Sequence, residues 1–433
     1  MRCFALFSVV MFLTAPTAWA QAPVRLTLDE ALMRGLDASH RLAEIGARQE
    51  AAQAVEDQRK AAARPQAALQ AGYARTNHVQ EFGIPGGRLI YPDIPDNVRS
   101  RVDLQWPIYT GGRTSALTRA AAAEADALGQ DRDAARADLK LEITRAYWAV
   151  VTARASVEVV NAALGRIGAH LADVRNQLNV GLVPPSDVLT LEVQQAHQQQ
   201  LLIEAQNLIE TSSADFRRLV GLAPEAPFDL ADRLDAPGAR SRQIAALVDA
   251  AKANRAERKA LEIRLGGASE RKTAAEAGRM PLIATAGGYD FARPNPRIFP
   301  REAAWKTSWD IGVNLNWSLF DGGRTRAEVA EAAANQRAAE ERLKEFDVTV
   351  DAEVRQRAVD LSSVEVAIAA AEVGVRSAEE ARRVVAERFS AGVATNTDVI
   401  DAQVALLQAE LDRTRALANV HLAAARLDRV TGQ

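Results

Sequence analysis

The chain contains one long sequence unit twice, and this duplication limits the folds that it can adopt. The stretch "PIYTGGRT" at residues 107–114 returns as "SLFDGGRT" at 318–325, an offset of 211 positions (322 − 111 for the first glycine of each pair). The glycines Gly181 and Gly392 keep the same offset (392 − 181). A repeat of this length indicates that each copy builds the same structure.

The N-terminus is predicted to be a cleaved secretory signal. Arg2 supplies the charged start, residues 4–13 form the apolar core, and Ala18-Trp19-Ala20 is a small-x-small cleavage site. The alternative, a membrane anchor, is disfavoured because the apolar core is about half as long as a spanning helix needs. The predicted organisation is a signal peptide at 1–20, a first structural repeat at 21–240 and a second structural repeat at 241–433.

Cysteine content and charge exclude several classes of site. Cys3 is the only cysteine and lies inside the predicted signal, so we expect no disulfide, no thiolate metal site and no thiol nucleophile in the mature chain. The formal net charge of −3 argues against nucleic acid as a partner. No later segment offers the roughly 20 unbroken apolar residues of a membrane helix. If the exported chain enters a membrane, it must do so as strands.

Each repeat is predicted to contain two strands joined by a loop rich in proline and glycine. The first strands begin at Arg64 and Met280, and the second strands alternate apolar and polar residues. This alternation is typical of outer-membrane barrel strands and equally of a half-buried soluble sheet, so the pattern alone leaves both open. The apolar positions are Val102, Leu104, Trp106 and Ile108 in the first copy, and Trp309, Ile311, Val313, Leu315, Trp317 and Leu319 in the second.

Very long helices follow the strands. No proline interrupts the chain from Arg113 to Leu178, which predicts one helix of about 100 Å. Its apolar residues step by threes and fours, as in a coiled coil, and a return helix follows each turn. One chain supplies four strands, which cannot close a barrel, and open edges are not tolerated in lipid. We therefore predict α-helical coiled coils continuous with a transmembrane β-barrel of twelve strands shared by a homotrimer.

This arrangement resembles the TolC-like outer-membrane efflux protein family over essentially the whole mature chain. The resemblance rests on the duplication, on "PIYTGGRT" and "SLFDGGRT", and on the turn phrases "VGLVPPSDVL" and "AGVATNTDVID". It implies a trimer whose barrel lies in outer-membrane lipid of a Gram-negative bacterium, above a periplasmic tunnel of helices. Such proteins are exit ducts that dock on a periplasmic adaptor protein and, through it, on an inner-membrane transporter.

Two alternatives to an efflux duct follow from the same features. Type I protein secretion uses a similar duct, and the sequence leaves small-molecule efflux and secretion both open. A soluble periplasmic coiled-coil adaptor or structural protein also contains long helical hairpins. Adaptors normally have one hairpin, whereas this chain has two, together with strands whose apolar faces suit lipid.

Acidic residues follow both helical turns. Asp398 and Asp401 are spaced i, i+3 and share one helix face. From the residues alone, helix capping explains them as well as a pore does, because Thr395 and Asp398 have capping-box spacing. The resemblance implies a ring of carboxylates that constricts the periplasmic entrance. Asp187, behind Ser186, occupies the matching place after the first turn, and capping accounts for it equally well.

The turns themselves are expected to end helices and, by the resemblance, to dock the adaptor. Glycine suits a helix end with positive φ, and Pro184 and Pro185 stop one helix and permit the next. In the family, a tyrosine and an arginine near the second turn hold the entrance shut. Phe389 and Ala394 occupy those positions here and cannot make the same hydrogen bonds. The expected docking residues are Gly181, Leu182, Val183, Ser186, Gly392, Val393 and Thr397.

The repeated double glycine is interpreted as a joint between strand and helix. A phosphate-binding loop would need a βαβ unit and further glycines or a lysine, which are missing from both copies. Glycine permits backbone conformations that other residues avoid. The residues expected at the two joints are Gly111, Gly112 and Arg113 in the first repeat and Gly322, Gly323 and Arg324 in the second. Trp106, Tyr109, Trp309 and Trp317 are expected to form an interfacial aromatic belt or to pack strands.

Catalysis is not expected, and neither is a cofactor. The sequence contains no G-x-S-x-G or Walker motif and no H-x-x-x-H spacing. We interpret the histidines as exposed helix residues without a catalytic role; they are His40, His78, His170, His197 and His421.

Overall fold

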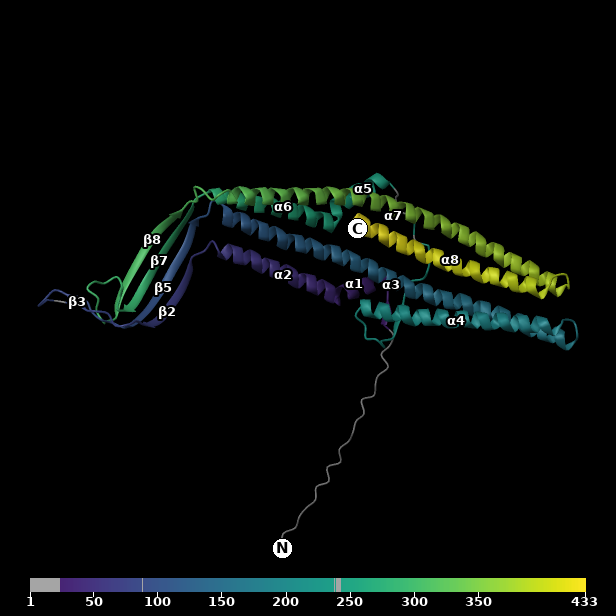
Figure 1. The fold of residues 1–433 in the computed structure, drawn as a ribbon. Coiled ribbons are helices and arrows are strands. Elements are labelled where there is room, and N and C mark those ends of the chain that lie inside the picture. Colours follow the sequence, from purple (N-terminus) through teal and green to yellow (C-terminus); the bar gives the residue numbers. More distant parts are fainter. Residues whose placement is uncertain (1–23, 88, 237, 239–242) are drawn as a thin grey trace, which may run out of the picture. The chain divides into compact units, whose positions relative to one another are not determined.

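The computed structural model describes residues 24–87, 89–236, 238 and 243–433 (Figure 1). The predicted signal peptide lies outside the described residues. The chain forms two compact units, each built from segments of both repeats. The described parts of Met1–Ser39, Leu139–Gly238 and Ser362–Ala425 form the first, here called the hairpin unit. His40–Asp138, the described part of Ala239–Leu361, and Arg426–Gln433 form the second, here called the strand unit.

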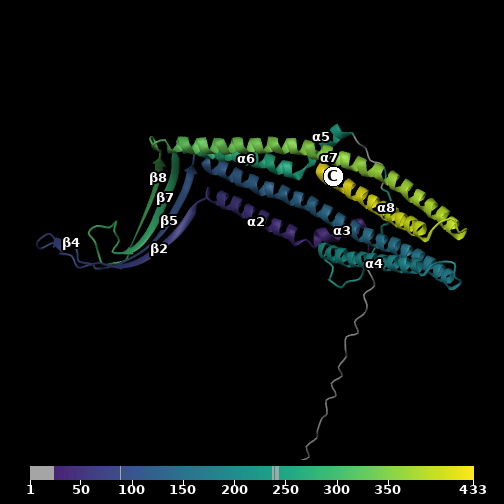
Figure 2. The same cartoon turned by 45° about the vertical axis from the view of Figure 1, so that its right-hand side comes forward.

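The strand unit contains a four-stranded antiparallel sheet in the order β2–β5–β7–β8 (Figure 2). The strands are β2 (Gln66–Arg75), β5 (Asp96–Tyr109), β7 (Leu282–Arg293) and β8 (Lys306–Asn316). The two strands of each repeat are neighbours, and β5 pairs with β7 to join the repeats. Four strands per chain were predicted, and the sheet contains four.

The two faces of this sheet differ in chemistry. On one face the Arg101 guanidinium pairs with the carboxylates of Asp103 at 2.6 Å, Asp310 at 2.9 Å, and Asp290. Gly288 leaves the space that this guanidinium occupies, since a Cβ there would collide with it. On the other face, the apolar residues of β8 from Trp309 to Leu315 are exposed. The polar face is thus cross-linked by ion pairs across strands, while the apolar face has solvent-accessible side chains.

The structure differs from the predicted strands in two places. The alternation predicted a strand that reached Leu319, but β8 ends at Asn316. The strand ends there because its partner does: β7 begins at Leu282, which lies opposite Asn316, so the residues after Asn316 have no strand to pair with in this sheet. The loop after β2, predicted only as a loop rich in proline and glycine, contains a small hairpin of β3 (Phe82–Gly83) and β4 (Leu89–Tyr91).

The predicted long helices are confirmed. The helices α3 (Arg113–Asn179) and α7 (Arg324–Ser390) each contain 67 residues and keep the offset of the repeat at both ends. The return helices are α4 (Pro185–Leu219) and α8 (Asn396–Thr431). In the described part of the chain, we find no helix that combines the length and the hydropathy needed to cross a membrane.

Shorter helices precede the strands. The amphipathic stretch of each repeat is divided into two helices, and the first of them, α1, begins with a capping box between Thr27 and Glu30. A short 3-10 turn leads into β7. The bounds are α1 (Leu28–Asp37), α2 (His40–Ala61), α5 (Ile244–Asn254), α6 (Ala256–Glu276) and η1 (Ala277–Arg279).

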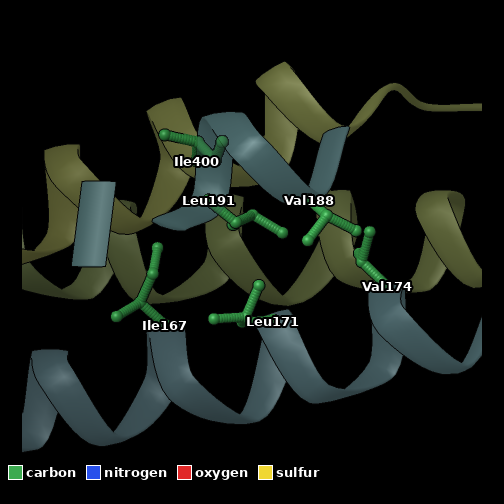
Figure 3. Close-up of a cluster of buried hydrophobic side chains, with 6 residues drawn as sticks. All are labelled: Ile167, Leu171, Val174, Val188, Leu191 and Ile400. Carbon is green, nitrogen blue, oxygen red and sulfur yellow. The ribbon is translucent and has the colours of Figure 1, made fainter. Parts of the chain in front are cut away.

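In the hairpin unit the long helices form a row in the order α7, α8, α3, α4 (Figure 1). Ile368 of α7 packs with Leu417 and Val420 of α8. Leu407 of α8 packs with Val160 of α3. A third cluster joins α3 and α4 and includes one residue of α8 (Figure 3); its members are Ile167, Leu171, Val174, Val188, Leu191 and Ile400. Each neighbouring pair in the row therefore shares a buried apolar seam.

A small parallel pair of strands in the hairpin unit was not predicted. The strand β1 (Val24–Leu26) pairs with β6 (Phe228–Leu230). The Tyr147 hydroxyl of α3 lies 2.7 Å from the Asp232 carboxylate and 3.2 Å from the Leu26 carbonyl oxygen. This buried tyrosine ties both strands to the long helix. Strands of three residues show no readable alternation, so the sequence pattern could not reveal them.

Candidate functional site

Both helix-to-helix turns have the same geometry. The Leu182 N–H donates to the Gln177 carbonyl at 2.9 Å, and the Gly181 N–H donates to the Leu178 carbonyl at 2.9 Å. These two bonds make a Schellman motif, which needs a residue with positive φ. Gly181 and Gly392 both have φ of 74°, and a Cβ at either would meet nothing within 4 Å. The backbone conformation, rather than lack of space, therefore requires glycine here.

The expected docking residues gather at these turns. Leu182 and Val393, at equivalent places in the repeats, are large apolar side chains exposed to solvent. Val183 instead packs against the cluster that joins α3 and α4. The other expected residues, Gly181, Ser186, Gly392 and Thr397, are exposed. The first turn thus exposes two large apolar side chains, Val180 and Leu182, and the second exposes one, Val393.

Asp398 caps α8. Its carboxylate accepts hydrogen bonds from the Thr395 N–H and the Thr395 hydroxyl, each at 2.8 Å. The Asp398 N–H donates to the Thr395 Oγ1 at 3.2 Å, which completes a capping box. The bond from the Thr395 N–H lowers the pKa of Asp398 below its usual value. Asp401, one turn later, is exposed. The structure thus gives Asp398 a capping role, whereas Asp401 presents a carboxylate to solvent.

Asp187 has a different role from Asp398. The N-cap residue of α4 is Pro184, and no side chain caps this helix. The nearest polar partner of the Asp187 carboxylate is the Ser186 hydroxyl, at 3.4 Å. It is the main chain of Asp187 that makes a long-range contact, because its carbonyl oxygen accepts from the Asn396 side-chain amide at 3.1 Å.

A buried histidine extends this contact to a third helix. The His170 Nε2 of α3 lies 2.9 Å from the Asn396 Oδ1, and both side chains are buried. Because the Asn396 amide nitrogen donates to Asp187, its oxygen accepts, so His170 supplies the proton on Nε2. The result is a chain of hydrogen bonds from α3 through the start of α8 to the start of α4. We call His170, Asn396 and Asp187 the inter-hairpin link.

The expectation of exposed helix histidines is wrong for His421, which is half-buried and stacks on Trp148, for His78, which lies in a loop, and for His170, which is 9% exposed. Its ring also makes an edge contact with Phe389, with centroids 5.1 Å apart. Phe389 in turn packs against the cluster of Figure 3. The position where the family resemblance implies a latch tyrosine therefore contributes an apolar contact to the inter-hairpin link. Ala394 is partly exposed.

The double glycines turn the backbone from strand to helix, as their spacing predicts. The φ angles are 61° and 85° at Gly111 and Gly112, and 66° and 92° at Gly322 and Gly323. A Cβ on Gly111 would also collide with the Met280 side chain. The residues that follow, Arg113 and Arg324, are the first of α3 and α7.

Each joint is capped by the residue just before its glycines. The Asp321 carboxylate accepts from the Gly323 N–H at 3.0 Å and the Thr325 N–H at 2.8 Å. Hydrogen bonds from the Thr325 hydroxyl and amide lower the pKa of Asp321 to about 2. In the first repeat Thr110 takes this place and accepts from the Thr114 N–H at 3.3 Å. Arg113 is exposed, and Arg324 pairs with Glu328 at 3.5 Å.

The combination of very long helical hairpins with strands that expose an apolar face is typical of outer-membrane channel folds. The chain belongs to the outer membrane efflux protein family, whose profile matches residues 32–222 and 247–433. This membership agrees with the expectation that the chain is not an enzyme.

Relatives and a solved structure agree with this assignment. The chain is 28% identical to CyaE of Bordetella pertussis over 366 residues, 82% of this chain and 74% of that protein. It is 25% identical to TolC of Vibrio cholerae over 279 residues, 64% of each, so the alignment spans slightly less than two thirds of TolC.

The outer membrane protein VceC of Vibrio cholerae has the same fold, with a TM-score of 0.79 at 21% identity, covering 94% of this chain and 96% of VceC. This likeness confirms the predicted fold of the chain, in which long helical coiled coils continue from strands.

Proposed function

We propose that the chain is the outer-membrane exit duct of an efflux system in a Gram-negative bacterium, extending into the periplasm as a homotrimer. A periplasmic adaptor and an inner-membrane transporter would deliver the cargo to it. The observation that carries this proposal is the sheet of the strand unit, which has an exposed apolar face and two edge strands. The family assignment supports the same conclusion at the level of an efflux channel.

The sheet has the dimensions and the chemistry of a barrel segment. Its strands contain 10, 14, 12 and 11 residues, and a tilted membrane strand needs about 9–11. Within the described residues, β2 and β8 each pair with one neighbour in this sheet. Open edges are not tolerated in lipid, so β8 of one copy is proposed to pair with β2 of the next. Three copies of four strands then close a barrel of twelve.

The acidic entrance is proposed to depend chiefly on Asp401. Asp398 uses its carboxylate in the capping box, whereas the Asp401 carboxylate is exposed one turn further along α8. In a trimer these residues and Asp187 would supply carboxylates from both hairpins of every copy. A ring of this kind attracts cations and repels anions. The exposed Leu182 and Val393 at the turns are proposed as the contacts for the adaptor.

One substitution in β8 tests the membrane proposal. Ile311→Lys places a charge on the apolar face, and Asn314→Lys places the same charge on the polar face of the same strand. A lysine that faces lipid costs about 2–4 kcal/mol at the bilayer midplane, whereas one that faces a lumen does not. We expect the wild type and Asn314→Lys to need detergent for extraction and to run as heat-sensitive trimers, and Ile311→Lys to fail to assemble. Release of the wild type without detergent as a monomer would contradict the proposal.

A further inference from the structure

The loop between β7 and β8 lies at the end of the sheet away from the helices. The double-glycine joints lead from β5 and β8 into α3 and α7, so the loops that connect paired strands lie at the opposite end. In a barrel whose helices extend into the periplasm, that end faces the cell exterior. The loop turns back beside the sheet, whereas the β3–β4 hairpin extends away from it (Figures 1 and 2).

This loop is longer than its connection requires. Paired antiparallel strands are usually joined by about two to five residues. Here β7 ends at Arg293 and β8 begins at Lys306, which leaves 12 residues between them (305 − 293). The additional residues make contacts that a simple hairpin turn would not make.

Two side chains of the loop bind the polar face of β8. The Asn295 amide donates to the Ser308 Oγ at 3.0 Å and, at the same distance, to a main-chain carbonyl oxygen of β8. The Arg297 guanidinium pairs with the Asp310 carboxylate at 2.8 Å. Ser308 and Asp310 alternate with the exposed apolar residues of β8, so they belong to the face on which Arg101 lies. The loop therefore lies on the polar face of the sheet.

A third side chain attaches the loop to β4 and β5. The Arg301 guanidinium donates to the Tyr91 hydroxyl at 2.9 Å and lies over the same ring, 5.1 Å from its centroid. It also donates to the Asn97 Oδ1 at 3.4 Å. Asn97 lies two residues before Arg99, so both occupy the ion-paired face of β5. Because β7 lies between β5 and β8 in the sheet, the loop crosses it. We call residues 294–301 the strap.

Burial along the polar face agrees with these contacts. At the strap end, Asp290 is 0% exposed and Ala292 is 1% exposed. At the helix end, Asn314 and Asn316 are exposed. Asn295 is 2% exposed although it belongs to a loop. A buried amide is costly unless it is hydrogen-bonded, so the bonds from Asn295 to β8 favour one bound position of the strap.

We propose that the strap narrows the external mouth of the barrel and keeps bulky solutes outside the cell from entering the lumen. This inference rests on the proposed trimer, in which the polar face lines the lumen and three straps surround one mouth. Each strap lies on the lumen side of the barrel wall and reduces the free width there. Its anchors are hydrogen bonds and ion pairs at a partly exposed surface, which are individually weak, so outgoing cargo can displace it.

Labelling of a lumen cysteine from outside the cell tests the strap. Cys3 lies in the predicted signal, so Asn314→Cys supplies the one thiol of the mature chain. This position is on the polar face of β8, four residues (314 − 310) and about 14 Å beyond Asp310 at ~3.4 Å per residue. Intact cells are treated with a small maleimide or with a maleimide on a polyethylene glycol chain too large for porins. We expect the small reagent to react quickly and the large one slowly.

Releasing the strap should admit the large reagent. Adding Asn295→Ala and Arg297→Ala to Asn314→Cys removes both side-chain anchors on β8, so the rate of labelling by the large maleimide should rise several-fold. The rate with the small maleimide should change little. Lys306→Ala is the matched control, because it removes a positive charge from the same end of β8. The Lys306 Nζ pairs with Glu302 of the same loop at 3.5 Å and does not hold the strap on the sheet.

The outcomes separate this inference from the proposed function. Native mass spectrometry in detergent reports the trimer in each variant, so that unfolding is not mistaken for an open mouth. If the large maleimide labels the trimer equally fast with and without the two anchors, or if Lys306→Ala accelerates it as much, the strap is wrong and the duct proposal stands. If neither reagent labels Asn314→Cys in any folded variant, while both label the denatured chain, the polar face lines no accessible lumen. The duct proposal then fails together with the strap.

Discussion

The indole N–H of Trp317 donates a hydrogen bond to the Arg279 carbonyl oxygen at 3.1 Å. The equivalent Trp106 donates to the Ala63 carbonyl at 3.2 Å. Each acceptor lies three residues before the first strand of its repeat (282 − 279 and 66 − 63). The two tryptophans, one in β5 and one just after β8, thus tie this part of each repeat to the chain that enters its first strand. They have a defined bonding role, in addition to the belt or packing role that their position suggested.

Removing the indole N–H of Trp317 should lower the stability of the strand unit. Trp317→Phe keeps an aromatic ring but leaves the Arg279 carbonyl without its partner. We expect the free energy of unfolding to fall by about 0.5–1.5 kcal/mol, the usual worth of such a bond. Trp309→Phe is the control, since the Trp309 indole makes no hydrogen bond within the described residues. Denaturant titration of both variants in detergent measures the difference, and equal losses would contradict the role assigned to Trp317.

The cap at the second joint should make stability depend on pH in acid. The pKa of Asp321 is lowered to about 2 by its hydrogen bonds from Thr325, against an ordinary value near 3.8. A lowered pKa means that the carboxylate stabilises the folded state above pH ~4 and that this contribution is lost as the pH falls toward ~2. Asp321→Thr installs the uncharged cap that Thr110 provides in the first repeat.

The measurement is the difference in thermal midpoint between wild type and Asp321→Thr. We expect the wild type to melt higher near neutral pH and the difference to shrink between about pH 4 and pH 2. A difference that stays constant over this range would show that the Asp321 charge contributes nothing to the joint.

The inter-hairpin link should hold the entrance in its resting state. His170→Ala leaves the buried Asn396 oxygen without a donor, which costs about 1–3 kcal/mol. If the link restrains the two hairpins, this variant should also raise the open probability in planar bilayers. His197→Ala, on the exposed surface of α4, should change neither quantity. Lower stability with unchanged conductance would make the link purely structural.

The spacing of apolar residues predicted the long helices because the pattern is averaged over many residues. Over the 67 residues of α3, steps of three and four outweigh individual exceptions, and the absence of proline allows one unbroken helix. The glycines of the joints and turns were readable because positive φ excludes most other residues. The strands β1 and β6 contain three residues each, too few for a pattern to be recognised. Their attachment to Tyr147 depends on the tertiary structure and has no local signal in the sequence.

The entrance was only partly predictable. Capping-box spacing anticipated the bonds between Thr395 and Asp398. The burial of His170 could have been predicted from the sequence. The residue lies three positions after Ile167 and four before Val174, so it falls on the apolar seam of α3. Its bond to Asn396 could not have been predicted, since the two are far apart in the sequence and no local pattern indicates that they meet.

The last prediction separates the two aspartates that follow the second turn. Asp401→Asn removes an exposed carboxylate that makes no cap, so stability should change by less than about 0.5 kcal/mol. If Asp401 lies in the entrance ring, the channel formed by this variant should prefer cations less than the wild-type channel does. Asp398→Ala removes the capping box and should lower the free energy of unfolding by more than Asp401→Asn does. Reversal potentials under a salt gradient measure the ion preference, and denaturant unfolding curves of the same variants measure the stability. A reversal potential identical to wild type in Asp401→Asn would remove Asp401 from the ring, because a carboxylate that lines a narrow entrance must act on passing ions.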